Sequence, residues 1–358
     1  MNFIDYGSLV STETTIDKSD VYKDPKAWRK IVVKYQKPCR KKAIGQIANT
    51  LLPMLALWVA MAFVYDISYW LTIPLILLTA GLTVRTFIIF HDCGHQSFFK
   101  SRKANDIVGY FMGVLTFTPY RFWHWEHGIH HSTAGDLDGR AEGDIWTMTV
   151  KEYEASSKGM RFAYRLVRSP LILFTIAPMF LFLVWQRFSS KKAKRKDRLS
   201  VVWTNIGIAA MVAIGCYLLG WQKYVILQLS VCAISTTAGV WMFYVQHQFE
   251  DVYWARKEEW NFAAAALEGS SFYKLPKILQ WFSGNIGFHH IHHLSSRIPN
   301  YRLEECHNAE PLFQQVPCLT IRTSLTCTQY RLLDEDNNRL VGFNYLKEYR
   351  KNQQEKAA

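Results

Sequence analysis

Four runs of about twenty apolar residues, almost free of charge, constrain this chain more than any other feature of its sequence. They lie at 44–65, 70–90, 201–220 and 223–245. A run of this length can cross the hydrocarbon core of a bilayer as a helix. The first begins after about forty polar and basic residues, which is unlike a cleavable signal peptide. The sequence therefore predicts an all-α integral membrane protein with four transmembrane helices.

The formal net charge of +13 is distributed unevenly around these runs. Nine Lys and Arg lie in 23–42, before the first run, and seven lie in 187–198, before the third. The short connections 66–69 and 221–222 carry none. Positive charge collects on the cytoplasmic side of membrane proteins, so we expect both termini and both basic clusters there. No nucleic-acid motif accompanies the charge, and we expect no nucleic-acid partner.

Two less apolar segments, 106–118 and 170–186, are harder to assign. If 106–118 crossed the membrane alone, the first two histidine clusters would lie on opposite sides of it. If 170–186 crossed alone, the basic cluster 187–198 would lie outside the cytoplasm. We therefore expect re-entrant or interfacial helices, with Pro178 splitting the second. Six spans remain possible only if both segments are hairpins. Gly109 and Gly113 form a small-x-x-x-small step that allows close helix packing.

The chain divides into three parts by composition. Residues 1–43 form a lead-in with an amphipathic stretch at 25–36, residues 44–310 form the main domain, and residues 311–358 form a C-terminal cytoplasmic extension. We expect its tail near 350–358 to be disordered. The seven cysteines contain no C-x-x-C pair, so we expect reduced thiols rather than disulfides.

Histidines form three clusters beside the apolar runs: HDCGH at 91–95, HWEHGIHH at 124–131 and HHIHH at 289–293. His247 lies alone at the end of the fourth run. The i, i+3 and i, i+4 spacings place the rings of a cluster on one helix face, and all the clusters lie at one membrane face. Zinc takes four protein ligands and an octahedral ion about six, so eight or nine converging imidazoles imply two metal ions.

The other histidines and the neighbouring acids carry weaker expectations. His124 and His290 fall outside the repeated spacing, and His307 is expected at the surface. Carboxylates can accept the second N–H of a ligating ring, and the candidates for that role are Asp92, Glu126, Asp144 and Glu250, with Asp144 preferred.

The type of ligand limits which metal ions the site can bind. Soluble di-iron bundles use Glu and Glu-x-x-His ligands, which are absent here. An all-imidazole site favours iron or zinc and leaves copper open. Attack on a lipid C–H bond at the headgroup level needs redox chemistry, which zinc lacks.

At these residues the chain resembles the membrane fatty acid desaturases, most closely the bacterial acyl-lipid branch with its omega-6/delta-12-like and delta-5-like members. HDCGH, HGIHH and HHIHH resemble the family's three histidine boxes, and QHQFED its fourth-span histidine region. HHLSSRIPNYRLEECH resembles the sequence after the third box. The similarity covers roughly 40–310. Three residues separate the histidines of the first box, and the acyl-CoA branch has four.

The resemblance implies a helical bundle with a cytoplasmic cap that holds two iron ions, with O₂ as co-substrate. It implies these ligands: His91, His95, His127, His130, His131, His247, His289, His292 and His293. The implied reaction places a cis double bond in an acyl chain of a membrane glycerolipid in the bacterial cytoplasmic membrane. The chain lacks the cytochrome b5 H-P-G-G motif of many relatives, so we expect a separate ferredoxin-like or flavodoxin-like donor.

Two other readings stay open. A fatty acyl or carotenoid hydroxylase shares the box chemistry and differs in its product. A membrane metal transporter or electron carrier is a different class. A transporter should carry ionisable ligands near the bilayer midplane, whereas these histidines lie at one face.

Overall fold

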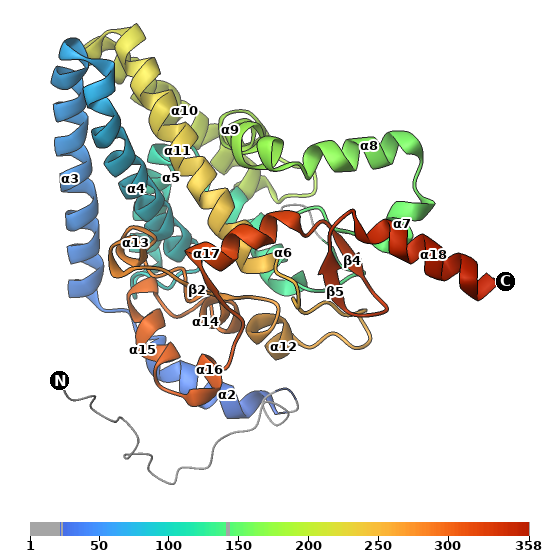
Figure 1. The fold of residues 1–358 in the computed structure, drawn as a ribbon. Coiled ribbons are helices and arrows are strands. Elements are labelled where there is room, and N and C mark those ends of the chain that lie inside the picture. The colour runs from blue at the N-terminus through green and yellow to red at the C-terminus, as the bar shows by residue number, and fades with distance from the viewer. Residues whose placement is uncertain (1–21, 23, 141–143, 358) are drawn as a thin grey trace, which may run out of the picture.

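The computed structural model describes residues 22, 24–140 and 144–357, so about half of the N-terminal lead-in lies outside the described residues. Its upper half is a bundle of four long helices (Figure 1), and each is long and apolar enough to cross a membrane. They are α3 (Arg40–Ile67), α4 (Tyr69–Gly94), α10 (Arg195–Leu219) and α11 (Trp221–His247). These helices confirm the four predicted spans.

The share of buried residues shows that α4 lies at the centre of the bundle and α3 at its edge. In the most apolar window of α4, 56% of the residues are buried, against 11% for α3. Leucine, valine and phenylalanine side chains of α3 therefore face outward, as Leu52 and Phe63 do. Apolar side chains on an outer helix face are stable only against lipid.

The segment 106–118 forms one interfacial-length helix, α5 (Arg102–Leu115), and not a hairpin. The glycine step explains how closely it packs on its neighbours. A Cβ added at Gly109 would lie 2.1 Å from the Tyr120 ring, and one at Gly113 would lie 2.5 Å from the Thr118 carbonyl oxygen. Any larger residue would force α5 away from the elements that carry the first two histidine clusters.

The segment 170–186 is not split at Pro178, contrary to the prediction from the sequence; it runs on through the proline and bends before residue 172. A π-helical turn, η2 (Ile172–Ile176), runs into α9 (Ala177–Leu183), whose first turn contains Pro178, and η3 (Trp185–Arg187) follows. Together they make an angle of 53° with α8 (Lys158–Val167), the geometry of a broken span or a re-entrant loop.

Helix α8 extends sideways from the bundle (Figure 1). Unlike a helix on the surface of a soluble protein, it turns polar side chains toward the protein and apolar side chains outward. Arg161, Tyr164 and Arg168 hydrogen-bond inward to the protein, while Phe162 and Leu166 are exposed. An outward apolar face suits the membrane boundary. Sequence analysis did not assign this helix.

A cap of short elements lies below and to the right of the bundle in Figure 1. Its helices at the N-terminal side are α2 (Pro25–Val32), η1 (Val33–Tyr35), α6 (Tyr120–Thr133) and α7 (Val150–Ala155). The later helices are α12 (Phe262–Leu267), α13 (Lys277–Phe282), α14 (His289–Leu294), η4 (Asn300–Arg302), α15 (Leu303–His307), α16 (Pro311–Gln314), α17 (Ile321–Ser324), η5 (Leu325–Gln329) and α18 (Tyr345–Ala357).

Two small sheets connect distant parts of the cap. The first has the order β1 (Met148–Thr149), β4 (Leu332–Asp334), β5 (Arg339–Val341), with β1 parallel and β5 antiparallel to β4. The second pairs β2 (Phe272–Lys274) with β3 (Cys318–Thr320) in parallel. They join residues 318–320 to 272–274 and residues 332–341 to 148–149.

The expectation of a disordered tail was wrong for the described residues, because α18 continues to Ala357. The segment is rich in Lys, Glu, Gln and Arg, which favour helix. Arg350 also anchors the helix by a bidentate pair with Glu154 at 2.9 and 3.0 Å.

Candidate metal centre

Nine histidine rings converge where the bundle meets the cap. Four elements carry these rings. The end of α4 carries His91 with His95 just beyond it, and the end of α11 carries His247. Helix α6 carries His127, His130 and His131, and α14 carries His289, His292 and His293.

The first group contains five rings whose candidate ligand atoms all lie within 4.8 Å of one another: His91, His95, His127, His131 and His292. The Nε2 atom of His91 lies 3.0 Å from that of His292 and 3.1 Å from that of His127. Two nitrogens bound at about 2.1 Å to one ion, at right angles, are about 3 Å apart. The spacing therefore fits a metal ion shared by these rings.

The second group contains four buried rings: His130, His247, His289 and His293. The Nε2 atom of His247 lies 2.9 Å from that of His289, and the Nε2 atom of His130 lies 3.3 Å from that of His293. The His131 and His293 rings are 4.3 Å apart between centroids, so the two groups adjoin. The arrangement can hold two ions side by side.

Burial favours the neutral form of five histidine rings in the cap. It lowers the pKa of His127 and His131 on α6, and of His289, His292 and His293 on α14, well below the ordinary value, and the neighbouring rings lower it further. A neutral imidazole keeps a lone pair for a metal ion. If so many rings packed together without a metal ion, some of their buried nitrogens would have no partner. The Nε2 atom of His95 has no hydrogen-bond partner among the described residues.

In three of the nine rings the opposite nitrogen, Nδ1, meets an acceptor, which leaves Nε2 toward the centre. The Nδ1 atom of His91 lies 3.0 Å from the Asp92 carboxylate, and that of His130 contacts the Asp144 carboxylate. The Nδ1 atom of His247 lies 3.1 Å from the Gly269 carbonyl oxygen. An acceptor at Nδ1 holds the proton there and directs the Nε2 lone pair to a metal ion.

The other two predicted carboxylates lie elsewhere. Glu126 lines a cavity next to His127 and His130. Glu250 accepts a hydrogen bond from the Tyr330 hydroxyl at 2.8 Å, and no hydrogen bond joins it to a described histidine. The structure adds Asn300, whose backbone and side-chain N–H groups donate to Asp92 at 2.6 and 2.8 Å. Its only sequence signal is its place in the run after the third cluster.

The three remaining histidines lie outside both groups. The rings of His124 and His95 are 5.9 Å apart between centroids. His290 is buried, and its Nε2 lies 3.0 Å from Nδ1 of His307. The expected surface position of His307 was wrong, because its side chain is 7% exposed. It packs against Phe272 and Phe288, contacts that its sequence position does not reveal.

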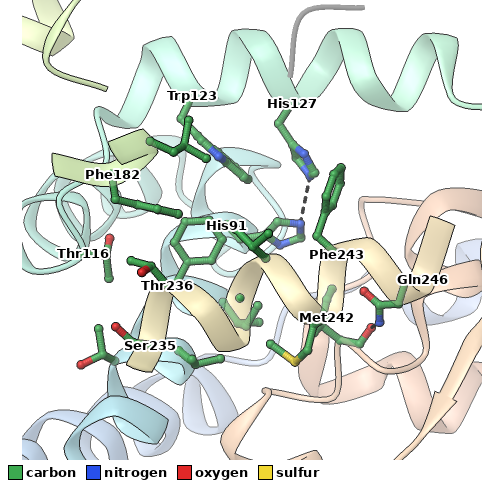
Figure 2. Close-up of a pocket in the computed structure, with 18 of the residues that line it drawn as sticks. His91, Thr116, Trp123, His127, Phe182, Ser235, Thr236, Met242, Phe243 and Gln246 are labelled. Carbon is green, nitrogen blue, oxygen red and sulfur yellow. Dashed lines mark hydrogen bonds between the residues drawn. The ribbon is translucent and has the colours of Figure 1, made fainter. Parts of the chain in front are cut away.

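An apolar cavity of about 200 Å³ leads from the rings into the bundle. His91 and His127 of the first group and His289 of the second lie in its wall. Figure 2 shows Trp123 and Phe243 beside the histidines, and Thr116, Ser235 and Thr236 at the far end. On α11 the lining residues run from Ser235 to Gln246, eleven residues apart, which is about 16 Å along the helix axis. The lining is mostly apolar, as a hydrocarbon chain requires.

Comparisons with known proteins agree with this site. A family model described as fatty acid desaturase matches residues 67–318. A Bacillus subtilis protein named "Fatty acid desaturase" is 47% identical over 318 residues, which cover 89% of this chain and 90% of that protein.

More distant cyanobacterial relatives carry finer names. A Picosynechococcus "sn-1 oleoyl-lipid 12-desaturase" is 26% identical and covers 67% of this chain and 69% of its own length. A Nostoc "sn-1 acyl-lipid omega-3 desaturase (ferredoxin)" is 28% identical, with 65% and 66% covered.

Proposed function

The chain belongs to the fatty acid desaturase family, and from this premise we propose that it places a cis double bond in acyl chains of membrane glycerolipids, using two iron ions and O₂. The observation that carries the proposal is the apolar cavity whose wall contains rings of both histidine groups. A chain lying in that cavity would pass directly beside the metal centre.

The donor set supports iron. The five rings around His91 would hold one ion, and the four rings around His247 the other. All nine candidate ligands are imidazoles, which iron accepts and which zinc would also accept. Zinc has no redox chemistry, whereas iron, when bound, would activate O₂, which is reduced to two waters by two hydrogens from neighbouring methylenes together with two electrons from the donor and two protons.

The residues of the chain position the substrate and keep the site dry. Trp123, Phe182 and Phe243 line the cavity next to the rings (Figure 2) and leave little room for water around an acyl chain. Asp92 and Asp144 hold protons on the outer nitrogens of their histidines, so the inner nitrogens stay available. Fixing the chain beside the centre is the protein's main contribution to rate.

We place the site at the cytoplasmic face and infer a small acidic electron carrier. The described residues of the two basic clusters, 24–42 and 187–198, adjoin the end of the bundle at which the histidines gather. A basic face attracts an acidic redox protein and speeds its encounter. The name of the Nostoc relative specifies ferredoxin, which supports a ferredoxin-like donor, with flavodoxin as the alternative carrier.

The proposed substrate is a chain already esterified to glycerol. The three-residue spacing in the first cluster and the acyl-lipid names of two relatives support this choice. A hydroxylase of the same histidine class would use the same centre but leave oxygen on the chain, so the product separates the two activities.

The test is conversion of a labelled saturated phospholipid by purified protein in bilayer discs with a ferredoxin reductase system. We expect a cis double bond in the intact lipid, and loss of that product in His91→Ala. Hydroxylated chains as the main product would establish a hydroxylase. Conversion of acyl-CoA alone would contradict the glycerolipid substrate.

A further inference from the structure

The two histidine groups differ in how close they lie to the protein surface. All four rings of the second group are buried, whereas His95 and His131 of the first group are partly exposed. The His95 ring also contacts the other four rings of its group, with centroids between 4.7 and 5.0 Å apart. A protein that delivers electrons would therefore reach the metal centre most directly over the first group.

Helix α6 has a second face besides the one that lines the apolar cavity, called the acyl cavity below. His127 points from α6 toward that cavity (Figure 2). His124, Gly128 and His131 stand at positions i, i+4 and i+7 and share another face of the helix. His124 and Gly128 are exposed there, and the His124 ring lies 5.9 Å from the His95 ring between centroids. We call His124, Gly128 and His131 the entry face.

Gly128 is the residue of the entry face that internal packing does not explain. It lies inside α6, it is exposed, and no atom lies within 4 Å of where a Cβ would stand. A glycine inside a helix is less favourable than an alanine, and nothing in the described fold requires the missing side chain. Its absence lets the surface of a partner come closer to the rings beneath it.

The N-termini of two helices surround the entry face with positive charge. The ion pair of Arg121 with Asp106 at 2.8 Å joins α6 to α5, and the Phe122 N–H donates to Ser200 of α10 at 3.0 Å. Each helix N-terminus carries partial positive charge of its own. The exposed basic residues at or just before these two N-termini are Lys100, Arg102, Lys103, Lys194, Arg195, Lys196 and Arg198.

Acidic side chains do little to offset this charge. Asp106 and Asp197 are the carboxylates that act on His124. Asp106 is paired with Arg121, and Asp197 is buried. The other basic cluster, 24–42, differs in this respect, because its Lys42 pairs with Glu305 and the exposed Glu304 follows the same turn.

We propose that the entry face is the docking site of a small acidic one-electron carrier. The inference rests on the proposed function, because forming a double bond with O₂ requires two electrons from a donor. Each encounter oxidises the carrier by one electron, which passes to the centre held by the histidines, and two encounters supply one turnover. Charge complementarity attracts the carrier, and the missing side chain at Gly128 lets it approach the first group.

The test measures the Kd of an acidic plant-type ferredoxin for the iron-loaded protein in bilayer discs. We expect weaker binding as the ionic strength rises from about 0.02 to 0.3 M, because salt screens the attraction. The double variant Arg102→Gln/Lys103→Gln should raise the Kd on the order of tenfold at low salt. Positive side chains oppose the dipole at a helix N-terminus, so removing them should not destabilise α5. The matched control, Lys347→Gln/Lys356→Gln on α18, should leave the Kd unchanged.

Gly128→Leu separates docking from folding. The added side chain points into open space and favours helix, so iron per chain should stay the same and Tm should not fall. The Kd for ferredoxin should nevertheless rise on the order of tenfold, because the side chain holds the carrier away. Gly159→Leu, at an exposed position of α8, is the matched control and should keep the wild-type Kd.

Three outcomes would overturn the docking site. They are a wild-type protein that does not bind ferredoxin, an unchanged Kd in both Gly128→Leu and the α5 double variant, and a Kd that rises only when Arg40 and Lys41 are replaced by Gln. The last result would place the carrier on the N-terminal cluster. Binding that Gly128→Leu weakens, in a protein that forms no double bond, would refute the proposed function and leave the docking site standing.

Discussion

Asp92→Asn tests how the structure prepares the first histidine group for metal. One Asp92 oxygen lies 3.0 Å from Nδ1 of His91, and the other accepts two hydrogen bonds from Asn300. An asparagine keeps the shape but has only one acceptor oxygen. Its NH₂ must then face either Asn300 or His91, and both present N–H donors.

The two orientations differ in cost. With the NH₂ toward Asn300, two buried donors lose their acceptor, at about 1–3 kcal/mol each. With the NH₂ toward His91, two N–H groups face each other. The ring can remove this conflict by moving its proton from Nδ1 to Nε2, the nitrogen that faces the other rings of the first histidine group. The second orientation costs less in folding, so we expect the variant to fold and to lose metal affinity by about 10- to 100-fold, or roughly 1.4–2.7 kcal/mol.

The assay is competition for iron against chelators of graded strength, with metal per chain measured by mass spectrometry and Tm measured without metal. Asp66→Asn is the matched control, because Asp66 is 63% exposed and pairs with Lys223 at the opposite end of the bundle. Wild-type iron retention by a folded Asp92→Asn protein would refute the idea that Asp92 fixes the His91 tautomer.

Four further outcomes are expected. Purified protein should carry about two irons per chain, one for each histidine group, and His293→Ala should lower that content in metal analysis; one zinc and no iron in active protein would contradict this. Because burial lowers the pKa of five cap histidines, among them His131 and His292, these rings stay unprotonated in the metal-free fold at pH values where the unfolded chain binds protons. Its stability should hold above about pH 6.5 and fall as the pH drops below that value. A Tm in detergent that does not change between pH 7.5 and about 5.5 would exclude this linkage. Gly239→Leu should fold and should reduce conversion of the longest acyl chains first, because Gly239 lines the acyl cavity and no atom lies within 4 Å of where a Cβ would stand; an unchanged product profile would mean that the chain does not reach it. A topology reporter fused after Lys196 should report cytoplasm, and an external signal there would mean that α8–η3 crosses the membrane completely.

The membrane helices and the helix faces of the histidines were predictable because their signals are local. Hydrophobic length alone defines a span, and α3, α4, α10 and α11 coincide with the four predicted runs to within a few residues at most ends. The step from Gly109 to Gly113 likewise indicated close packing. The helical form of 350–357 was missed because the charged composition suggested solvent, whereas the Arg350–Glu154 contact joins residues 196 positions apart.

The sequence could not predict to which of the two histidine groups each ring belongs. His130 and His131 are neighbours in the sequence, yet they belong to different groups, and the same holds for His292 and His293. Successive residues on a helix point about 100° apart, so two adjacent rings can reach two different ions. Which ion each ring reaches depends on how α6 and α14 are placed against α4 and α11.

The sequence by itself determined that the chain enters a membrane, that its histidines gather at one end of the spans, and that spacing gives each cluster a common face. These properties follow from helix geometry and hydrophobic length, which need no knowledge of neighbours. Only the tertiary structure decided the division of the rings into five and four, the hydrogen bonds that join Asn300, Asp92 and His91, and the buried His290–His307 pair. It also decided the position of the Gln186 amide oxygen, which has no hydrogen-bond partner among the described residues. Each of these depends on side chains brought together from distant segments, where packing and the pairing of buried polar atoms, not sequence spacing, determine the partner.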